Sequence, residues 1–214
     1  MKILITAGPT QEPIDPVRFI SNRSSGKMGY AVARAAVARG HDVRLISGPV
    51  SIPAPAGATV VTAVTAEDMR REVEASLDWA DALVMAAAVA DWRPKRVSPH
   101  KLKKRDMPAA LELEPAPDIL KAVAPRKGGR VFVGFAAETR DVEREAARKM
   151  REKNLDLTVA NNVSRPDSGF GADTNKVTLL TPDGGVQALP VMSKEDVGLR
   201  IVEWIEKRGG AATR

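Results

Sequence analysis

The chain has 214 residues, of which 43% are hydrophobic and 4% aromatic, so it is long enough for one large α/β domain with an aliphatic core. It has no cysteine and two histidines, which excludes disulfides and thiolate metal sites and leaves too few ligands for most zinc sites. The net charge of +6 is compatible with nucleic acid or with small anionic ligands as partners.

The sequence carries no recognisable signal for secretion or membrane insertion. Every apolar run falls short of the roughly 18 residues that a transmembrane helix requires, and no signal peptide is visible. Met1 and Lys2 lead directly into an apolar segment. These features predict a cytoplasmic protein that does not enter membranes.

Apolar runs alternate with helical patterns along most of the chain. The first strand is expected at 2–7, and the first helix at 26–39, ending at Gly40 because glycine readily adopts the left-handed conformation that follows a helix. Thr65 is expected to cap a helix over 66–79. Further strands are expected at 42–47, 82–90, 130–138 and 155–161, and further helices at the short segment from 117 and over 138–153.

The remaining segments have other patterns. Residues 91–116 are basic and then proline-punctuated, and are predicted to be a loop. Residues 176–191 indicate a β-hairpin around Pro-Asp-Gly-Gly, and a closing amphipathic helix with its start near Ser193 follows. The βαβ order predicts a three-layer α/β/α fold with a Rossmann-like, mostly parallel sheet extended by the C-terminal hairpin. We expect a single domain over 1–208 and a disordered tail over 209–214.

The motif SSGKMG at 24–29 opens the first predicted helix. It is not a Walker A motif, because Ser21 and Met28 occupy two of that motif's defining positions. A helix start nevertheless offers unpaired backbone N–H groups to an anion, and here Ser24, Ser25 and Lys27 add hydroxyls and charge. The motif therefore predicts phosphate or carboxylate binding. The alternative is an ordinary helix whose N-cap is Ser25.

Two further motifs follow the third predicted strand. AAAVADWRP at 86–94 allows close approach of a flat ring, and Asp91 could accept hydrogen bonds from a base or ribose or hold Mg²⁺ through water. Between Arg93 and Arg105, seven of thirteen residues are Lys or Arg and none is acidic. Such a loop could close over a polyphosphate. The alternatives are a buried strand with a capping Asp, and a solvated basic loop.

Together these motifs resemble one family, phosphopantothenate–cysteine ligase, also called phosphopantothenoylcysteine synthetase, in its bacterial CTP-dependent type. The matching stretches are ITAGPTQEPIDPVRFISNRSSGKMG, AAVADWRP, KLKK, PDIL, VGFAAET and KNLDLTVANNV, in the family's order from residue 3 to about residue 175. The family is often fused behind a flavin decarboxylase of coenzyme A biosynthesis. That half is missing from this sequence, so the resemblance implies no FMN.

The resemblance implies a two-step reaction. The carboxylate of 4′-phosphopantothenate attacks the α-phosphate of CTP with Mg²⁺ present, diphosphate leaves, and an acyl-cytidylate forms. The amine of L-cysteine then displaces CMP to give 4′-phosphopantothenoylcysteine. Neither step requires a protein nucleophile, so the enzyme has to position its substrates and neutralise charge.

The family's site residues map onto this sequence by motif. Asn22 is implied to hold the acyl-cytidylate by its acyl oxygen, and Lys101 is implied to act in the first step from a mobile loop. The family also implies a homodimer in which Arg18 reaches the neighbouring active site; it assigns no metal ligand here. The implied substrate-binding residues are Gly8, Arg18, Asn22, Ser24, Ser25, Gly26, Lys27 and Ala88, and the implied nucleotide-binding residues are Met85, Ala86, Ala87, Asp91, Lys101, Pro117, Asp118, Ile119, Leu120, Phe135, Lys149 and Lys153.

Two other functions are open from the residues. An NAD(P)-dependent Rossmann oxidoreductase requires a tight glycine turn directly after the first strand and usually an acid at the end of the second. Here a long segment follows Gly8, and the second strand ends in Ser47-Gly48-Pro49. A basic nucleic-acid-binding module would bind with strong salt dependence, but no aromatic residue interleaves with the cations of the basic loop.

Overall fold

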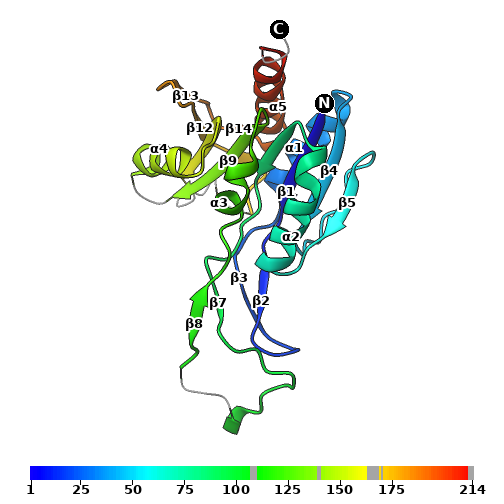
Figure 1. Ribbon diagram of the computed structural model, residues 1–214, viewed down its shortest axis with the longest axis vertical. Coiled ribbons are helices and arrows are strands. Elements are labelled where there is room, and N and C mark those ends of the chain that lie inside the picture. The colour runs from blue at the N-terminus through cyan, green and yellow to red at the C-terminus, as the bar shows by residue number, and fades with distance from the viewer. Residues whose placement is uncertain (107–109, 139–140, 163–168, 170, 212–214) are drawn as a thin grey trace.

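The first apolar strand of the chain lies within one central sheet of eight strands (Figure 1). Six neighbouring strands are parallel, and the two of the C-terminal hairpin are antiparallel at one edge. This confirms the mostly parallel α/β sheet with its hairpin extension. The order across the sheet is β13 (Val186–Ala188), β12 (Val177–Leu180), β10 (Leu157–Asn162), β9 (Val131–Glu138), β6 (Ala82–Met85), β1 (Lys2–Ala7), β4 (Asp42–Ser47) and β5 (Thr59–Thr62). The structure, a computed structural model, describes residues 1–106, 110–138, 141–162, 169 and 171–211.

Helices cover both faces of the sheet, which is why β1 is apolar on both sides. Ile3 and Ile5 pack into a core cluster with two helices on one face, whereas Leu4 packs with the helices of the other face. The first face carries α1 (Lys27–Ala38) and α5 (Lys194–Ala211), and the second carries α2 (Ala66–Ser76), α3 (Ile119–Val123) and α4 (Val142–Glu152). Short 3-10 helices extend or join these elements at Leu77–Trp79, Lys104–Asp106 and Ala124–Arg126.

The helix boundaries follow local sequence signals. Thr65 caps α2 through a reciprocal pair of hydrogen bonds with Asp68, as its position before the helix predicts. Asp118 caps α3 by accepting from the Lys121 amide at 3.2 Å. At the other end of the chain, α5 continues to Ala211, three residues into the segment where a disordered tail is expected.

The structure corrects the expected strand at 82–90, which ends at Met85. Beyond that point the chain turns across the end of β1, so its polar groups bond to another loop instead of a strand. The Ala88 amide donates to the Gly8 carbonyl at 2.9 Å, and the Thr10 amide donates to the Ala88 carbonyl at 3.3 Å. A run of apolar residues does not show where its strand leaves the sheet. In this run, the chain leaves the sheet after Met85, near the middle of the run.

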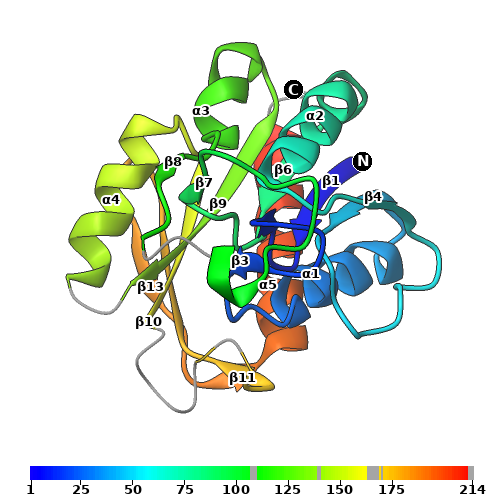
Figure 2. The same cartoon turned by 90° about the horizontal axis from the view of Figure 1, so that it is seen from below.

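A second correction concerns residues 91–116, which are expected to be a loop, and it extends to the long segment after Gly8. Each contains a pair of short antiparallel strands, and together they extend away from the carboxyl edge of the sheet as an arm, residues 11–21, 92–106 and 110–115 (Figures 1 and 2). The pairs are β2 (Gln11–Pro13) with β3 (Phe19–Ser21), and β7 (Trp92–Pro94) with β8 (Leu113–Pro115). Two more short strands, β11 (Thr174–Asn175) and β14 (Met192–Ser193), pair beside α5.

Candidate functional site

The carboxyl ends of the parallel strands bring the recognised motifs together. The segments that follow β1 and β6 both leave the sheet at this edge and bond to each other through Gly8 and Ala88. Glycine is required at Gly48, where the end of β4 comes so close that a Cβ would lie 1.9 Å from the Pro9 carbonyl oxygen. In open α/β sheets, ligands bind beyond this edge.

The SSGKMG motif begins α1, but Ser25 is not its cap. Gly26 is the N-cap residue, in the left-handed conformation with φ of 78°, and the described residues provide no side-chain cap. A Cβ on Gly26 would lie 2.7 Å from a methyl group of Val50, so both conformation and space require glycine. The first amides of α1 therefore point out of the helix without a capping side chain in front of them.

A cavity of about 120 Å³ lies at the start of α1; we call it the helix-start cavity. Its walls come from three places: the SSGKMG motif, the segment after β6, and the carboxyl ends of β9 and β10. The sequence-predicted residues among its lining are Ser24, Ser25, Gly26, Lys27, Ala86, Ala87, Ala88 and Phe135.

Two lysines make this cavity electropositive. Lys27 Nζ donates to Asp173 Oδ1 at 2.6 Å and to the Gly171 carbonyl at 3.1 Å. The hydrogen bond from Lys27 lowers the pKa of Asp173. The second is Lys194, which is buried and donates to the Gly169 and Ala172 carbonyls. Burial and then the nearby charge of Lys27 lower the pKa of Lys194.

Lys194 is a residue that motif reasoning missed. The sequence predicts only an amphipathic helix that starts near Ser193, and a lysine at such a position carries no functional signal. The available signal is its neighbourhood: Lys194 begins α5, whose packing against α1 brings it to the same cavity as Lys27.

A second cavity of about 580 Å³ adjoins the first; we call it the nucleotide-side cavity. The two share Ala87, Ala88, Phe135 and Ala137 as walls. Lys153 Nζ lies 3.2 Å from Asp118 Oδ1, so these two lining residues form an ion pair. Ten of the predicted nucleotide-binding residues line it: Met85, Ala87, Asp91, Pro117, Asp118, Ile119, Leu120, Phe135, Lys149 and Lys153.

Asn22 connects the two predicted groups of residues. It lies in the segment that joins the arm to α1, and its side chain lines the nucleotide-side cavity. Its Nδ2 donates to the Ala88 carbonyl at 2.9 Å, in the wall shared by both cavities. A carboxamide is thus fixed where the two cavities meet.

Three predicted residues lie outside the lining that the structure gives either cavity. Gly8 follows β1 and accepts from the Ala88 amide behind the shared wall, whereas Arg18 and Lys101 lie on the arm. Arg18 Nη2 pairs with Asp15 and donates to the Leu102 carbonyl, both at 2.6 Å. Within a single chain, therefore, the structure does not bring Lys101 to Asn22.

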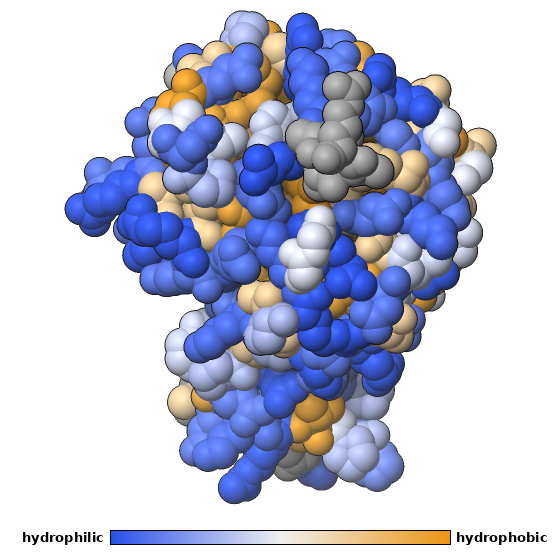
Figure 3. All heavy atoms as spheres, turned by 45° about the horizontal axis from the view of Figure 1, so that its top comes forward, coloured by the Kyte–Doolittle hydropathy of each residue, from blue (hydrophilic) through white to orange (hydrophobic). Residues whose placement is uncertain are grey.

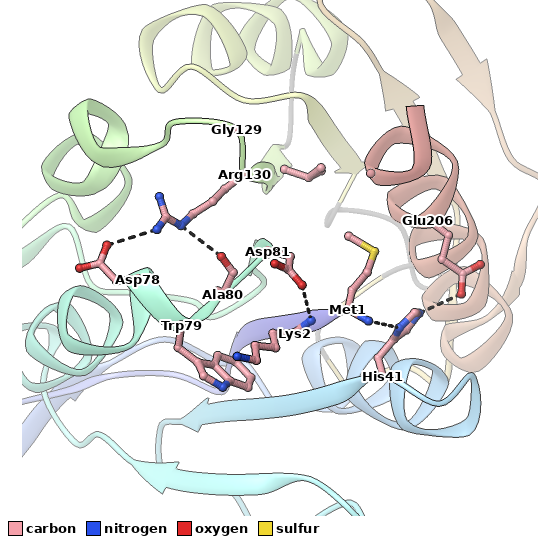
Figure 4. Close-up of a pocket in the computed structure, with 12 residues that line it drawn as sticks. Met1, Lys2, His41, Asp78, Trp79, Ala80, Asp81, Gly129, Arg130 and Glu206 are labelled. Carbon is pink, nitrogen blue, oxygen red and sulfur yellow. Dashed lines mark hydrogen bonds and ion pairs between the residues drawn. The ribbon is translucent and has the colours of Figure 1, made fainter. Parts of the chain in front are cut away.

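A cavity at the opposite edge of the sheet is more voluminous, about 880 Å³, but several of its charged groups are already paired with one another (Figure 4). Arg130 bonds Asp78 and the Ala80 carbonyl, and His41 bonds Glu206 at 2.8 Å. It lies at the amino ends of β1 and β6, away from the recognised motifs. Volume alone is therefore a poor guide to the functional site in this fold.

The described part of the chain contains no cluster of three or more His, Cys, Asp or Glu side chains that could hold a metal ion. It also contains no helix long and apolar enough to cross a bilayer.

These features define an α/β protein with a two-part ligand site at the carboxyl ends of parallel strands. Its family is established by comparison. The chain belongs to the family described as DNA/pantothenate metabolism flavoprotein C-terminal domain, whose model matches residues 1–208. This confirms the family resemblance indicated by the motifs.

Curated and solved relatives agree with this assignment. The chain is 52% identical over 204 residues to the coenzyme A biosynthesis bifunctional protein CoaBC of Bacillus subtilis (strain 168), a match of 95% of this chain and 50% of that protein. The chain thus spans about half the length of the curated relatives it matches. The crystal structure of the C-terminal domain of a CoaBC protein matches with a TM-score of 0.83 and 43% identity, covering 96% of this chain and 94% of that one.

A more distant protein shares the fold. A Cab2 variant solved in complex with phosphopantothenate-cysteine matches with a TM-score of 0.79 and 16% identity, covering 99% of this chain and 87% of that one.

Proposed function

We propose that the chain joins 4′-phosphopantothenate and L-cysteine to 4′-phosphopantothenoylcysteine, using CTP and passing through an acyl-cytidylate. The observation that carries the proposal is the meeting of two cavities at Asn22. One cavity begins at an anion-binding helix start, and the other is lined by ten predicted nucleotide-binding residues. Such an arrangement holds two anionic reactants side by side.

The helix-start cavity suits the phosphate of phosphopantothenate. Uncapped amides of α1 and the charge of Lys27 attract an anion, and the hydroxyls of Ser24 and Ser25 add donors. Lys27 Nζ donates to the carboxylate of Asp173, so a bound phosphate would take over a contact that an anionic group already makes.

The nucleotide-side cavity suits the triphosphate and base of CTP. Lys149 lies in the last turn of α4 and Lys153 is its C-cap residue, and both line this cavity, so they can neutralise phosphate charge together. The short side chains of Ala87 and Ala90 leave room for a flat ring against the backbone. The preference for CTP over ATP rests on the family's bacterial type.

Mg²⁺ fits this cavity as part of a nucleotide complex. Asp91 and Asp118 are the acidic residues among the described lining, and Mg²⁺ in nucleotide sites typically uses one or two carboxylates with phosphate oxygens and water. Asp118 already caps α3 and pairs with Lys153, which leaves Asp91 as the proposed contact. When bound, Mg²⁺ would neutralise charge that develops on the departing diphosphate.

Asn22 is proposed to serve the amide-forming step. An amide N–H aimed at the acyl oxygen would stabilise the negative charge that develops there when cysteine attacks. Lys101 is proposed to serve the first step by neutralising charge at the α-phosphate. A chain without cysteine is adequate for both steps, since positioning and electrostatics supply the catalysis.

We also propose a homodimer in which the arm of one copy completes the site of the other. Two observations support it. Arg18 and Lys101 lie on the arm, away from the cavities of their own chain. The arm also exposes large apolar side chains, including Phe19, Trp92 and Leu113, and Figure 3 shows apolar surface on this narrow extension. Exposed apolar area of this kind is typical of a protein interface.

Complementation tests the exchange of arms. In a mixture of Asn22→Asp and Lys101→Gln chains, each mixed dimer would hold one site with both native residues and one site with neither. Product formation is expected to recover to about a quarter of the wild-type rate, since random pairing makes half of the dimers mixed. If both residues act within one chain, no site is complete and mixing restores nothing.

The direct test of the reaction is diphosphate release from CTP and 4′-phosphopantothenate, with and without L-cysteine, and with ATP for comparison. We expect release that depends on phosphopantothenate, followed by CMP and the cysteine amide once cysteine is added. Folded protein with Mg²⁺ that releases diphosphate from neither nucleotide would contradict the proposal. A titration with labelled duplex and single-stranded DNA at two salt concentrations would then test the nucleic-acid alternative.

A flavin-dependent decarboxylase, fused or separate, is the proposed partner. It is supported by the relatives, which are bifunctional by name and about twice the length of this chain.

A further inference from the structure

A buried carboxylate lies in the arm, far from the cavities. The side chain of Asp15 is fully covered, although it belongs to the turn between two short strands. Its Oδ1 accepts from the Val17 amide at 2.8 Å and the Arg18 amide at 2.9 Å. Its Oδ2 accepts from Arg18 Nη2 at 2.6 Å and from the Leu102 amide at 3.1 Å.

The contact with Leu102 joins two segments that are 87 residues apart in sequence. Arg18 reinforces the junction, because the nitrogen that pairs with Asp15 also donates to the Leu102 carbonyl at 2.6 Å. A third link is the Ser98 amide, which donates to the Ile14 carbonyl at 3.0 Å. The base of the basic loop is thus fastened to the turn between β2 and β3. We call Asp15, Arg18 and Leu102 the Asp15 clamp.

A turn alone does not account for this geometry. An aspartate that accepts from the amides two and three residues ahead is a common turn motif, and it explains the bonds from Val17 and Arg18. It requires no partner from a distant loop and no buried Oδ2. In Asp15, one carboxylate oxygen shapes the turn and the other holds Leu102, so the second oxygen has a separate task.

The clamp requires a carboxylate. Burial acts to raise the pKa of Asp15, but the hydrogen bonds from Val17, Leu102 and Arg18 outweigh it and lower the pKa to about 2. All four contacts are donors, so an ionised carboxylate satisfies each of them. An asparagine would place an NH₂ group against N–H donors on one side and lose at least one contact.

We propose that Asp15 is a positioning residue for Lys101: it fixes the backbone of Leu102 and thereby sets where the neighbouring lysine is presented by the arm. The proposal rests on the proposed function, which gives Lys101 its task in the first step. It also assigns Arg18 a structural task within its own arm, in addition to any contact with substrate. A lysine that is displaced by about 1 Å can cost about 100-fold in rate, so fixing its backbone matters.

The test combines proteolysis and kinetics on the Asp15→Asn variant. Trypsin cleaves after Lys and Arg, and the loop offers such sites from Lys101 to Arg105. Asp15→Asn is expected to increase cleavage within 101–105 about 10-fold or more, because the loop base is released. In the same variant kcat for diphosphate release is expected to fall about 10-fold or more, with KM for CTP changed less than about twofold.

A matched control is Asp183→Asn. Asp183 also caps a turn, accepting from Thr181 and Gly185, but it lies between β12 and β13. Its loss is expected to leave both cleavage at 101–105 and diphosphate release at wild-type levels. A second variant, Leu102→Pro, removes the Leu102 amide while keeping Asp15 in its turn. It should reproduce the loss of kcat, and the double variant should lose no more than either single one.

The outcomes distinguish a failure of the proposed role of Asp15 from a failure of the proposed function. Unchanged cleavage and kcat in Asp15→Asn would overturn the proposal, and so would full additivity of Asp15→Asn with Leu102→Pro. If Asp15→Asn fails to fold, Leu102→Pro alone decides by the same two measurements. Wild-type protein that releases no diphosphate would refute the proposed function, while the cleavage comparison would still show whether the clamp holds the loop.

Discussion

Asn22 is the residue on which the two half-reactions are expected to separate. Its Nδ2 donates to the Ala88 carbonyl where the two cavities meet, and the proposed phosphate contacts come from Lys149 and Lys153. Asn22→Asp loses the donor and introduces a negative charge beside the reacting oxygen. We expect diphosphate release in a single turnover to persist and amide formation to fall about 100-fold.

Quenched-flow measurement of both products tests this, with Gln187→Glu on the exposed strand β13 as a remote control that also replaces an amide by a carboxylate. An equal fall in diphosphate release and amide formation would show that Asn22 acts before the intermediate forms, contrary to its proposed place.

Asp15 allows a prediction about acid stability. Its pKa is lowered from an ordinary 3.8 to about 2, so the folded chain binds this proton less well than the unfolded chain. The stabilisation is therefore present above about pH 5 and lost as the pH falls through 4 toward 2. The difference in free energy of unfolding between wild type and Asp15→Asn should stay constant from about pH 7 to 5 and shrink between about 4 and 3. Urea unfolding at these pH values measures it; a constant difference down to the lowest pH would contradict a charged Asp15.

At the residue scale, the sequence predicts site residues that belong to a contiguous motif. It misses residues whose role depends on contacts with segments far away in the chain. Ser24 to Lys27 and Pro117 to Leu120 are contiguous, so a motif identifies them and the structure places them in cavity walls. Lys194 and Asp15 become notable only through partners far away in sequence, Lys27 and Leu102. No local pattern contains such pairs.

At the element scale, the meeting of loops at the carboxyl edge should limit which glycines can be replaced. A Cβ on Gly48 would lie 1.9 Å from the Pro9 carbonyl oxygen, which is backbone and cannot rotate away. Gly48→Ala is expected to lower the free energy of unfolding by about 1–3 kcal/mol, the usual cost of overpacking. Gly129→Ala, where no described atom lies within 4 Å of the new Cβ, should cost nothing. Denaturant titration compares them; equal stability of both variants would refute the close contact.

The two mispredicted features have different causes. The run that begins with β6 is apolar to Ala90, yet only its first four residues pair in the sheet, because the Ala88 backbone bonds the loop after β1. The strands of the arm have three residues each and are rich in proline, so they carry too little periodicity to be recognised. The helices and the long strands were predicted because their periodicity extends over many residues.

At the scale of the whole molecule, the order of strands and helices was predictable because βαβ units leave few topologies. The arm was not predictable, and in the proposed dimer it completes the site. A single chain leaves Lys101 outside both cavities while ten nucleotide-side residues are already assembled. The sequence thus predicts a site that includes Lys101, but the fold of one chain does not bring Lys101 to the nucleotide-side cavity. The association of two chains is the simplest way to bring them together.

The arm therefore should control oligomeric state and activity together. Trp92 on β7 is 53% exposed and Val186 on β13 is 58% exposed, so each can be charged without disturbing a core. Trp92→Glu would place a charge in the proposed interface, where an unpaired buried charge is costly. We expect it to be monomeric by analytical ultracentrifugation and to lose diphosphate release, whereas Val186→Glu should stay dimeric and active. A dimeric, active Trp92→Glu would exclude the arm as the interface. A monomeric, fully active Trp92→Glu would show that each chain completes its own site, because Lys101 would then act without a partner.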